Sequence, residues 1–228
     1  MRPCCILERL FGYAHVRVSD DAALLERWRA GDASAGQTLL RRHFRSVYAF
    51  FANKVSHSAD DMIQETFRAC VEARDRIEDG TSFRAYLLTI ARRELYRSYR
   101  KAAVVVEFDP SQVSVEQLIA SPTALIARDQ NQQMLLRALR RLPLELQLVL
   151  ELTYWEQLPS HETAVVLEVP TGTVKSRLRR AREALREQLT LLANARGLSA
   201  ESIGDLDRWV ESVREELAMR APGGPRGG

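Results

Sequence analysis

Basic side chains gather in one short stretch of this chain. Between Thr171 and Arg186 the sequence carries six of them and a single acid, a local net charge of +5 in a chain of 228 residues whose overall net charge is +3. The basic residues are Lys175, Arg177, Arg179, Arg180, Arg182 and Arg186. Clusters of this kind bind phosphates, and an arginine can also donate two hydrogen bonds to a guanine edge. The indicated chemistry is noncovalent recognition of a nucleic acid.

Apolar residues recur at steps of three and four along the same stretch, and basic residues recur at similar steps along a different face. The apolar positions are Val174, Leu178, Ala181 and Leu185, and the basic positions are Lys175, Arg179 and Arg182. Residues 160–186 therefore predict a short helix, a tight turn and a second helix, the arrangement with which a helix-turn-helix enters the DNA major groove. A solvated basic helix on any α-helical protein is the alternative interpretation.

Helical periodicity extends over almost the whole chain, and the only short β-prone run is 103–108. The dipeptides Asp109-Pro110 and Ser121-Pro122 interrupt helices and separate two helical blocks. We therefore predict an all-α fold of two small helical domains joined by a flexible linker, the second a helix-turn-helix. The predicted units are a first domain at 19–101, a linker at 102–127, a second domain at 128–190 and a C-terminal extension at 191–228.

The first block is predicted to contain several amphipathic helices. Capping residues at 19–21 precede one helix, and apolar residues between 39 and 51 mark a second. Ser58 and Asp61 have the spacing of a capping box before a third helix. A further helix is expected over 83–100. With 46% hydrophobic residues, the chain can bury adequate cores beneath these helices.

The composition argues against several other classes of protein. No run of about 18 apolar residues is present, and the N-terminus lacks the apolar length of a signal peptide, so we expect a cytoplasmic protein without membrane insertion. The cysteines and histidines are Cys4, Cys5, Cys70, His15, His43, His57 and His161. Their spacing fits neither a disulfide framework nor a metal site nor a nucleophile–base pair. We therefore expect no cofactor, no metal and no catalytic residues.

Three segments together resemble one family, the bacterial RNA polymerase sigma factors. Residues 59–67 (ADDMIQETF) resemble its polymerase-binding segment, and residues 83–92 (FRAYLLTIAR) are similar to the promoter-melting segment that follows. Residues 170–183 (PTGTVKSRLRRARE) resemble its second DNA-reading helix. The compact size is typical of the extracytoplasmic-function (ECF) subgroup. The resemblance covers about 20–101 and 128–190, and three motifs in the right order are far more specific than one.

The resemblance implies a polymerase-binding surface on the first domain. In the family, the polar face of the corresponding helix grips a coiled coil of the polymerase clamp. The matching positions here are Asp61, Gln64, Glu65 and Arg68. Without the resemblance, an ordinary solvated helix face would be the preferred interpretation.

The resemblance also implies contacts with the promoter minus-ten element. The loop at 79–83 corresponds to the part of the family that holds a base flipped from the melted strand, and stacking or hydrogen bonding would stabilise such a base. The residues implied are Thr81, Ser82, Phe83, Arg92, Arg93, Tyr96 and Arg97. Two alternatives stay open: Phe83 as a core anchor, and Tyr96 or Tyr99 as a cap on the core.

By the same resemblance, the second domain reads the minus-thirty-five element as duplex DNA. The positions implied are Thr171, Thr173, Lys175, Ser176, Arg179, Arg180 and Arg182. Thr173 and Arg182 are expected to hold phosphates, which position a protein without specifying a sequence. The sequence departs from the family pattern at three places. Glu168 stands in a turn that commonly contains glycine, Gly36 lies where an aromatic residue is frequent, and residues 161–163 (HET) replace the usual acidic pair after the cap.

The function implied is that of an ECF sigma factor, a dissociable subunit that binds core RNA polymerase and directs it to promoters. An anti-sigma factor is an expected partner. A conventional helix-turn-helix regulator acting without polymerase is the alternative. The linker would lie near the polymerase active centre, as an acidic RNA mimic or as a plain spacer. The extension contains a predicted amphipathic helix at 199–219 with four more acids than bases, which suggests that it folds back onto the basic face.

Overall fold

The all-α prediction is confirmed. The computed structural model describes residues 18–55, 59–77, 82–102, 108–119 and 130–195. Within these ranges it contains nine α-helices and a single 3-10 turn, and it assigns no residue to a β-strand. The helix predicted at 199–219 lies outside the described residues.

The first domain opens with a helical hairpin. Helices α1 (Val18–Arg29) and α2 (Ala33–Ala52) are joined through Gly31, whose φ of 101° is a conformation that glycine adopts readily. Asp32 then caps α2, because its carboxylate accepts hydrogen bonds from the backbone N–H of Ser34 and of the next residue, at 3.0 and 3.1 Å. The turn and the cap direct α2 back along α1.

The hairpin is tightest where Trp28 crosses Gly36. Both residues are buried, and a Cβ atom at position 36 would lie only 2.4 Å from the indole Nε1. Glycine is required here for close approach, since the φ of Gly36 is ordinary for a helix. Trp28 thus fills the space that a side chain on α2 would otherwise occupy.

Replacement of Gly36 by alanine is expected to lower the free energy of unfolding by about 1–3 kcal/mol, because the added methyl group overpacks a buried contact. Urea denaturation followed by circular dichroism measures this change. The matched control is Gly172→Ala, where a Cβ meets nothing within 4 Å and α9 should become slightly more stable. A Gly36→Ala protein as stable as the wild type would contradict the close packing.

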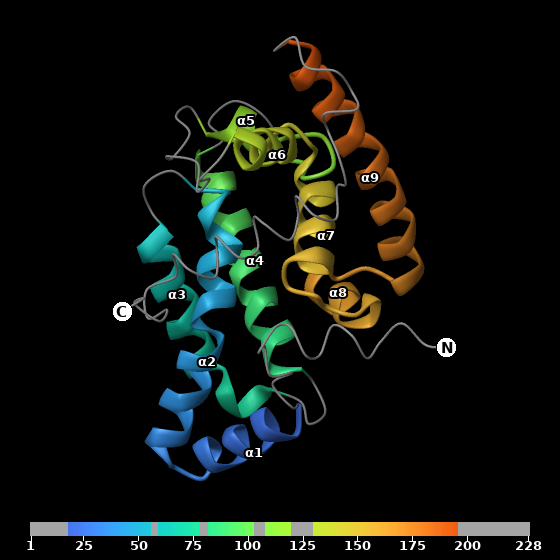
Figure 1. Ribbon diagram of the computed structural model, residues 1–228. Helices are drawn as coiled ribbons and strands as arrows, with labels where there is room; N and C mark the ends of the chain where they lie inside the picture. Colours follow the sequence, from blue (N-terminus) through green and yellow to red (C-terminus); the bar gives the residue numbers. More distant parts are fainter. Residues whose placement is uncertain (1–17, 56–58, 78–81, 103–107, 120–129, 196–228) are drawn as a thin grey trace, which may run out of the picture.

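Helices α3 (Ala59–Glu72) and α4 (Phe83–Ala102) complete the first domain, with a 3-10 turn at Arg74–Arg76 between them. In Figure 1, α2, α3 and α4 are neighbouring rods and α1 crosses one end of them. The fully buried side chains of this core include Leu39, Phe51, Leu87, Leu88 and Leu95. Helices α1 to α4 therefore form one packed unit.

Part of the predicted linker is packed against the second domain. Helix α5 (Val115–Leu118) begins with a capping box in which the side chains and backbones of Ser114 and Gln117 bond reciprocally. The backbone N–H of Leu144 donates to the carbonyl of Val113 at 2.9 Å, and Val115 is fully buried. The expectation of a flexible spacer therefore does not hold for residues 108–119.

The second domain consists of α6 (Gln130–Arg140), α7 (Leu144–Tyr154), α8 (Ser160–Leu167) and α9 (Thr171–Asn194). Helix α7 is buried on all sides from Leu144 to Leu152, because α6, α8 and α9 pack around it. Of the apolar stripe predicted for α9, Val174, Ala181 and Leu185 are buried, and Leu178 is half-buried against the core. Helix α9 continues to Asn194, four residues beyond the predicted domain boundary.

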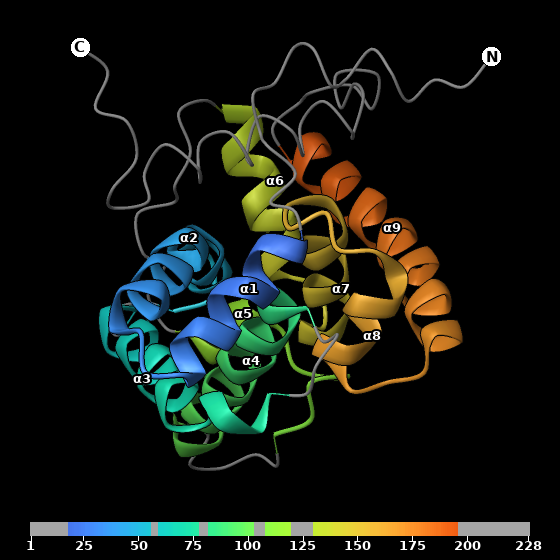
Figure 2. The same cartoon turned by 90° about the horizontal axis from the view of Figure 1, so that it is seen from below.

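The two domains lie against each other, with α8 packed along α4. Figure 1 shows α8 beside α4, and the view from below in Figure 2 shows the same neighbourhood from another direction. The helix-turn-helix therefore sits directly on the first domain. Within the described ranges, none of the helices is both long and apolar enough to cross a bilayer.

Candidate nucleic-acid interface

The helix-turn-helix is closed by a left-handed turn between α8 and α9. Glu168 adopts φ 55° and ψ 45°, and the backbone N–H of Val169 donates to the carbonyl of Ala164 at 3.1 Å. This is the usual way in which a helix ends at a left-handed residue. Pro170 then precedes the first turn of α9, where its fixed φ is compatible with the helix start.

The outer face of α9 carries most of the residues predicted to contact minus-thirty-five DNA. The exposed members are Thr171, Lys175, Ser176, Arg179, Arg180 and Arg182, and Thr173 is half-buried. The carboxylate of Glu183 lies 3.0 Å from Arg179, and both side chains are largely exposed. Such surface pairs are weak, so Arg179 can exchange its partner for a phosphate or a base. The structure brings these seven residues together at one end of a single helix.

Two arginines of α9 are held by residues of α7. Arg177 forms an ion pair with the buried Glu145 of α7 at 2.7 Å, and it therefore secures α9 to its own domain. Arg182 donates a hydrogen bond to the hydroxyl of Tyr154 at 2.5 Å and lies over that ring. These contacts hold Arg182 in a defined orientation on the exposed side of the helix.

Helix α4 presents a second basic face, but α8 covers part of it. Arg92 is buried, donates to the carbonyl of Leu167 at 3.1 Å and pairs with Glu168. Arg93 is largely exposed and also pairs with Glu168, at 2.5 Å. Arg97, one turn further on, is exposed and pairs with Glu94 of its own helix at 3.1 Å. The predicted minus-ten residues are therefore split between a covered and an open group.

Several aromatic residues near this face belong to the core. Phe83 is 3% exposed and packs against the ring of His43, so the interpretation of Phe83 as a base-stacking platform is not compatible with this arrangement. Tyr99 is buried and donates a hydrogen bond to the carbonyl of Lys54. Tyr96 is half-buried against Phe108. Ser82 is half-buried before α4, and Thr81 lies outside the described residues.

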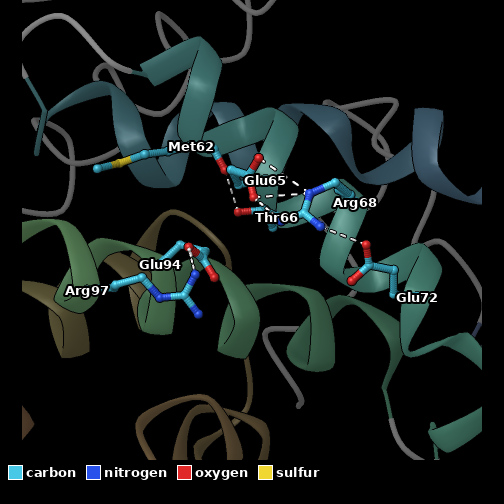
Figure 3. A network of polar contacts seen from close by, with 7 residues as sticks. All are labelled: Met62, Glu65, Thr66, Arg68, Glu72, Glu94 and Arg97. Atoms are coloured by element: carbon cyan, nitrogen blue, oxygen red, sulfur yellow. Dashed lines mark hydrogen bonds and ion pairs between the residues drawn. The ribbon is translucent and has the colours of Figure 1, made fainter.

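The predicted polymerase-binding residues form one polar face on α3. Asp61, Gln64 and Arg68 are exposed, and Arg68 holds Glu65 at 3.1 Å and Glu72 at 2.7 Å. Figure 3 shows this network on α3, with Glu94 and Arg97 of α4 across from it. The hydrogen bonds from Arg68, with smaller contributions from Arg97 and Lys101, lower the pKa of Glu65, so the face is charged at neutral pH.

Sequence reasoning missed a set of polar contacts between the two domains. Lys54 at the end of α2 is fully buried and pairs with the buried Glu151 of α7. Arg140 of α6 donates to the backbone carbonyl and the side-chain oxygen of Asn53, at 3.1 and 2.9 Å. No local pattern signals these pairs, because each joins residues about 90 positions apart whose neighbours look like ordinary helix ends.

Nothing in the described part of the chain suggests a metal site, since no cluster of three or more histidine, cysteine, aspartate or glutamate side chains is found there. Cys70 is fully buried on α3, and burial raises the pKa of its thiol to about 12. A neutral thiol of this kind is inert. The described residues offer binding surfaces made of charge and hydrogen bonds.

Comparison with known proteins relates both domains to the same family. The model for sigma-70 region 2 matches residues 37–104, which span α2 to α4. The model for sigma-70 region 4 matches residues 132–185, which include the helix-turn-helix. The two matches occur in separate domains, and neither includes residues 105–131.

Similar sequences and structures agree with these matches. The ECF RNA polymerase sigma-E factor of Escherichia coli (strain K12) is 28% identical over 176 residues, covering 72% of this chain and 92% of the relative. The RNA polymerase sigma-H factor of Pseudomonas aeruginosa is 28% identical over 181 residues, covering 74% and 93%.

Two solved structures share the fold. The sigma factor RpoE of Bartonella quintana, solved with the anti-sigma factor NepR, aligns with a TM-score of 0.52 at 24% identity, over 70% of this chain and 97% of that one. CnrH, solved with the cytosolic domain of CnrY, aligns with a TM-score of 0.53 at 22% identity, over 77% and 98%.

Proposed function

The chain belongs to the extracytoplasmic-function subgroup of bacterial RNA polymerase sigma factors, and we propose how its surfaces divide the work of that function. The polar face of α3 binds the clamp coiled coil of core RNA polymerase. The exposed basic residues of α4 contact the melted minus-ten strand, and α9 reads the minus-thirty-five duplex. The polymerase performs the catalysis, and the sigma factor acts as a dissociable specificity subunit without enzymatic activity of its own.

One observation carries this proposal: three separate polar faces occur on α3, α4 and α9, within two domains that match regions 2 and 4 of the same family. A conventional helix-turn-helix regulator needs only the face on α9. It offers no reason for the exposed set of Asp61, Gln64 and Arg68 on a helix far from the DNA-reading one. The regulator interpretation is therefore not favoured.

The partners follow from the same assignment. We propose core RNA polymerase and promoter DNA as the primary partners and a cytoplasmic location, where both are found. An anti-sigma factor is a further proposed partner, supported by the similarity to RpoE of Bartonella quintana, which was solved with its anti-sigma factor NepR. For the linker, the ion pair of Glu116 with Arg141 at 3.2 Å favours a structural role for this acid over mimicry of RNA.

Transcription reconstituted with purified core polymerase on fragmented genomic DNA tests the proposal. The wild-type protein should produce new start sites, and the upstream sequences shared by these sites define the promoter. Replacing Asp61, Gln64 and Glu65 together by alanine should weaken polymerase binding by on the order of a hundredfold or more and remove the new starts, as expected for several interface residues each contributing about 1 kcal/mol or more.

The matched control is Asp75→Ala, an exposed acid in the 3-10 turn that follows α3, which should leave the transcripts unchanged. Polymerase binding is measured separately by fluorescence anisotropy with labelled sigma factor. New starts that persist in the triple variant would show that the α3 face is not the polymerase site. Duplex binding without any polymerase-dependent transcript would instead support the conventional regulator.

A further inference from the structure

We propose that Glu168 is an internal competitor of promoter DNA, because its carboxylate occupies Arg92 and Arg93 of α4 while α8 rests on that helix. In this closed arrangement, part of the minus-ten surface is unavailable, and binding of the melted strand requires α8 to leave α4. The inference rests on the proposed function of α4. It adds a built-in restraint that involves no partner protein.

The contact has the geometry of a clamp. One oxygen of Glu168 pairs with Arg92, and the other accepts hydrogen bonds from Nη2 and Nε of Arg93, at 2.5 and 3.0 Å. Arg92 also donates to the backbone carbonyl of Leu167 at 3.1 Å. A single turn of the helix-turn-helix thus engages two consecutive arginines of the other domain, in the charge-assisted manner in which a phosphate would engage them.

The ion pairs of Glu168 are buried on the side of Arg92 and open to solvent on the side of Arg93. The side chain of Arg92 is 8% exposed, whereas the side chains of Glu168 and Arg93 are 46% and 66% exposed. Burial opposes ionisation of Glu168, but the hydrogen bonds from Arg93 and Arg92 outweigh it and lower its pKa. The carboxylate is therefore charged at neutral pH, and water and DNA can reach it from the open side.

Arg92 is not fully satisfied in the closed arrangement. Its Nε is buried and has no hydrogen-bond partner among the described residues, although the rest of the guanidinium is engaged. A buried unpaired donor is unfavourable, and native proteins rarely retain one without a reason. A phosphate or a guanine edge could use this donor after α8 has moved away. The unpaired Nε thus indicates that Arg92 also functions in a second arrangement, in which α8 has left α4.

The backbone at Glu168 supports the same conclusion. A residue other than glycine at φ 55° is disfavoured because its Cβ crowds the neighbouring carbonyl, and glycine would adopt this turn more easily. Glycine, however, has no side chain that could reach Arg92 and Arg93. The strained turn is therefore offset by contacts that exist only when the two domains touch, which ties the conformation of the turn to the closed arrangement.

The clamp covers one DNA surface and leaves the other free. The minus-thirty-five face of α9, which includes Lys175, Arg179 and Arg180, is exposed in the closed arrangement. The free protein is therefore expected to bind a duplex through α9 more readily than a single strand through α4. Opening also separates Lys54 from Glu151, and both charges are solvated again when the domains part.

The test compares Glu168→Gln, which removes the charge and keeps the side-chain size, with Glu168→Gly, which also relieves the turn. Dyes on cysteines introduced at the exposed positions Val71 and Leu191 report domain separation by energy transfer. The background carries Cys4→Ser and Cys5→Ser, while the buried Cys70 stays unlabelled. Binding of a labelled single strand of twenty thymidines reports access to α4, since base stacking and phosphate contacts tolerate any sequence.

Both variants are expected to lower the ratio of closed to open protein about tenfold. This factor lies between the effect of losing an exposed ion pair and the effect of losing a charge-assisted hydrogen bond. Affinity for the single strand should rise by a similar factor, because the competent fraction grows. Glu116→Gln is the matched control, since Glu116 is a half-exposed carboxylate that pairs with Arg141 away from both DNA faces, and it should change neither reading.

Energy transfer in Glu168→Gln equal to that of the wild type would overturn the proposal, as would domain opening without tighter binding of the single strand. Neither measurement requires polymerase. A failure of the wild-type protein to direct transcription would therefore count against the proposed function, whereas these two outcomes count against the clamp alone.

Discussion

Replacement of Lys54 by methionine should destabilise the protein by about 3–5 kcal/mol, because it leaves the buried carboxylate of Glu151 without its partner. Lys54 is fully buried and Glu151 is 4% exposed, so water cannot solvate the unpaired carboxylate unless the domains separate. Gln147 would still donate to Glu151 at 2.8 Å, but one neutral donor does not neutralise a carboxylate. Urea denaturation gives the change in stability, and small-angle X-ray scattering shows whether the domains move apart.

Two further variants separate the effect of charge from that of packing. The double variant Lys54→Met, Glu151→Leu should recover most of the lost stability, because apolar residues of similar size can replace a buried ion pair. Lys101→Met is the control, since this lysine is exposed at the end of α4 and its loss should change the stability by less than about 0.5 kcal/mol. If Lys54→Met proved as stable as the wild type, the buried pair would have no structural role.

Replacement of Arg179 and Arg180 by alanine should weaken binding to a minus-thirty-five duplex by about a hundredfold or more, since each arginine that reads a base edge contributes about 1–3 kcal/mol of discrimination. Both side chains lie on the exposed face of α9, and Arg179 forms a weak surface pair with Glu183. Fluorescence anisotropy with the duplex found upstream of the mapped start sites measures the affinity.

The salt dependence distinguishes the two kinds of contact. Each lost phosphate contact reduces the slope of log affinity against log salt by about 0.9, whereas a lost base contact reduces the preference for the promoter over a scrambled duplex. Arg186→Ala is the matched control, because Arg186 is an exposed arginine about one turn beyond Arg182, the last of the expected contacts. An unchanged affinity in the double variant would exclude this face of α9 as the reading surface.

The second domain was predictable because its signals are local. The apolar stripe of α9 follows the helical period, and Val174, Ala181 and Leu185 are buried as that period requires. The turn between α8 and α9 lies within the stretch predicted to contain it, and Pro170 beside it favours the start of a helix and not its interior. The roles of individual arginines did not follow, because Arg177 and Arg179 differ only in what lies beside them in space.

In the first domain too, local patterns predicted the helices but not the contacts of their side chains. The helices on either side of 79–82 were expected from their periodicity, but whether Phe83 faced a base or the core stayed open. Its burial against His43 depends on how α4 lies across α2, which no local pattern encodes. Likewise, the two prolines at 110 and 122 indicated a linker, and only the packing of Val115 showed that part of it is ordered.

By itself the sequence determined the helices, their buried faces, the two-domain organisation and the three segments that identify the family, because periodicity, capping and charge clusters act over a few residues. The tertiary structure alone decided which charged residues meet across the domains, including Lys54 with Glu151 and Arg92 with Glu168. The physical reason is that an ion pair depends on distance in space, and these partners lie 97 and 76 positions apart in the chain.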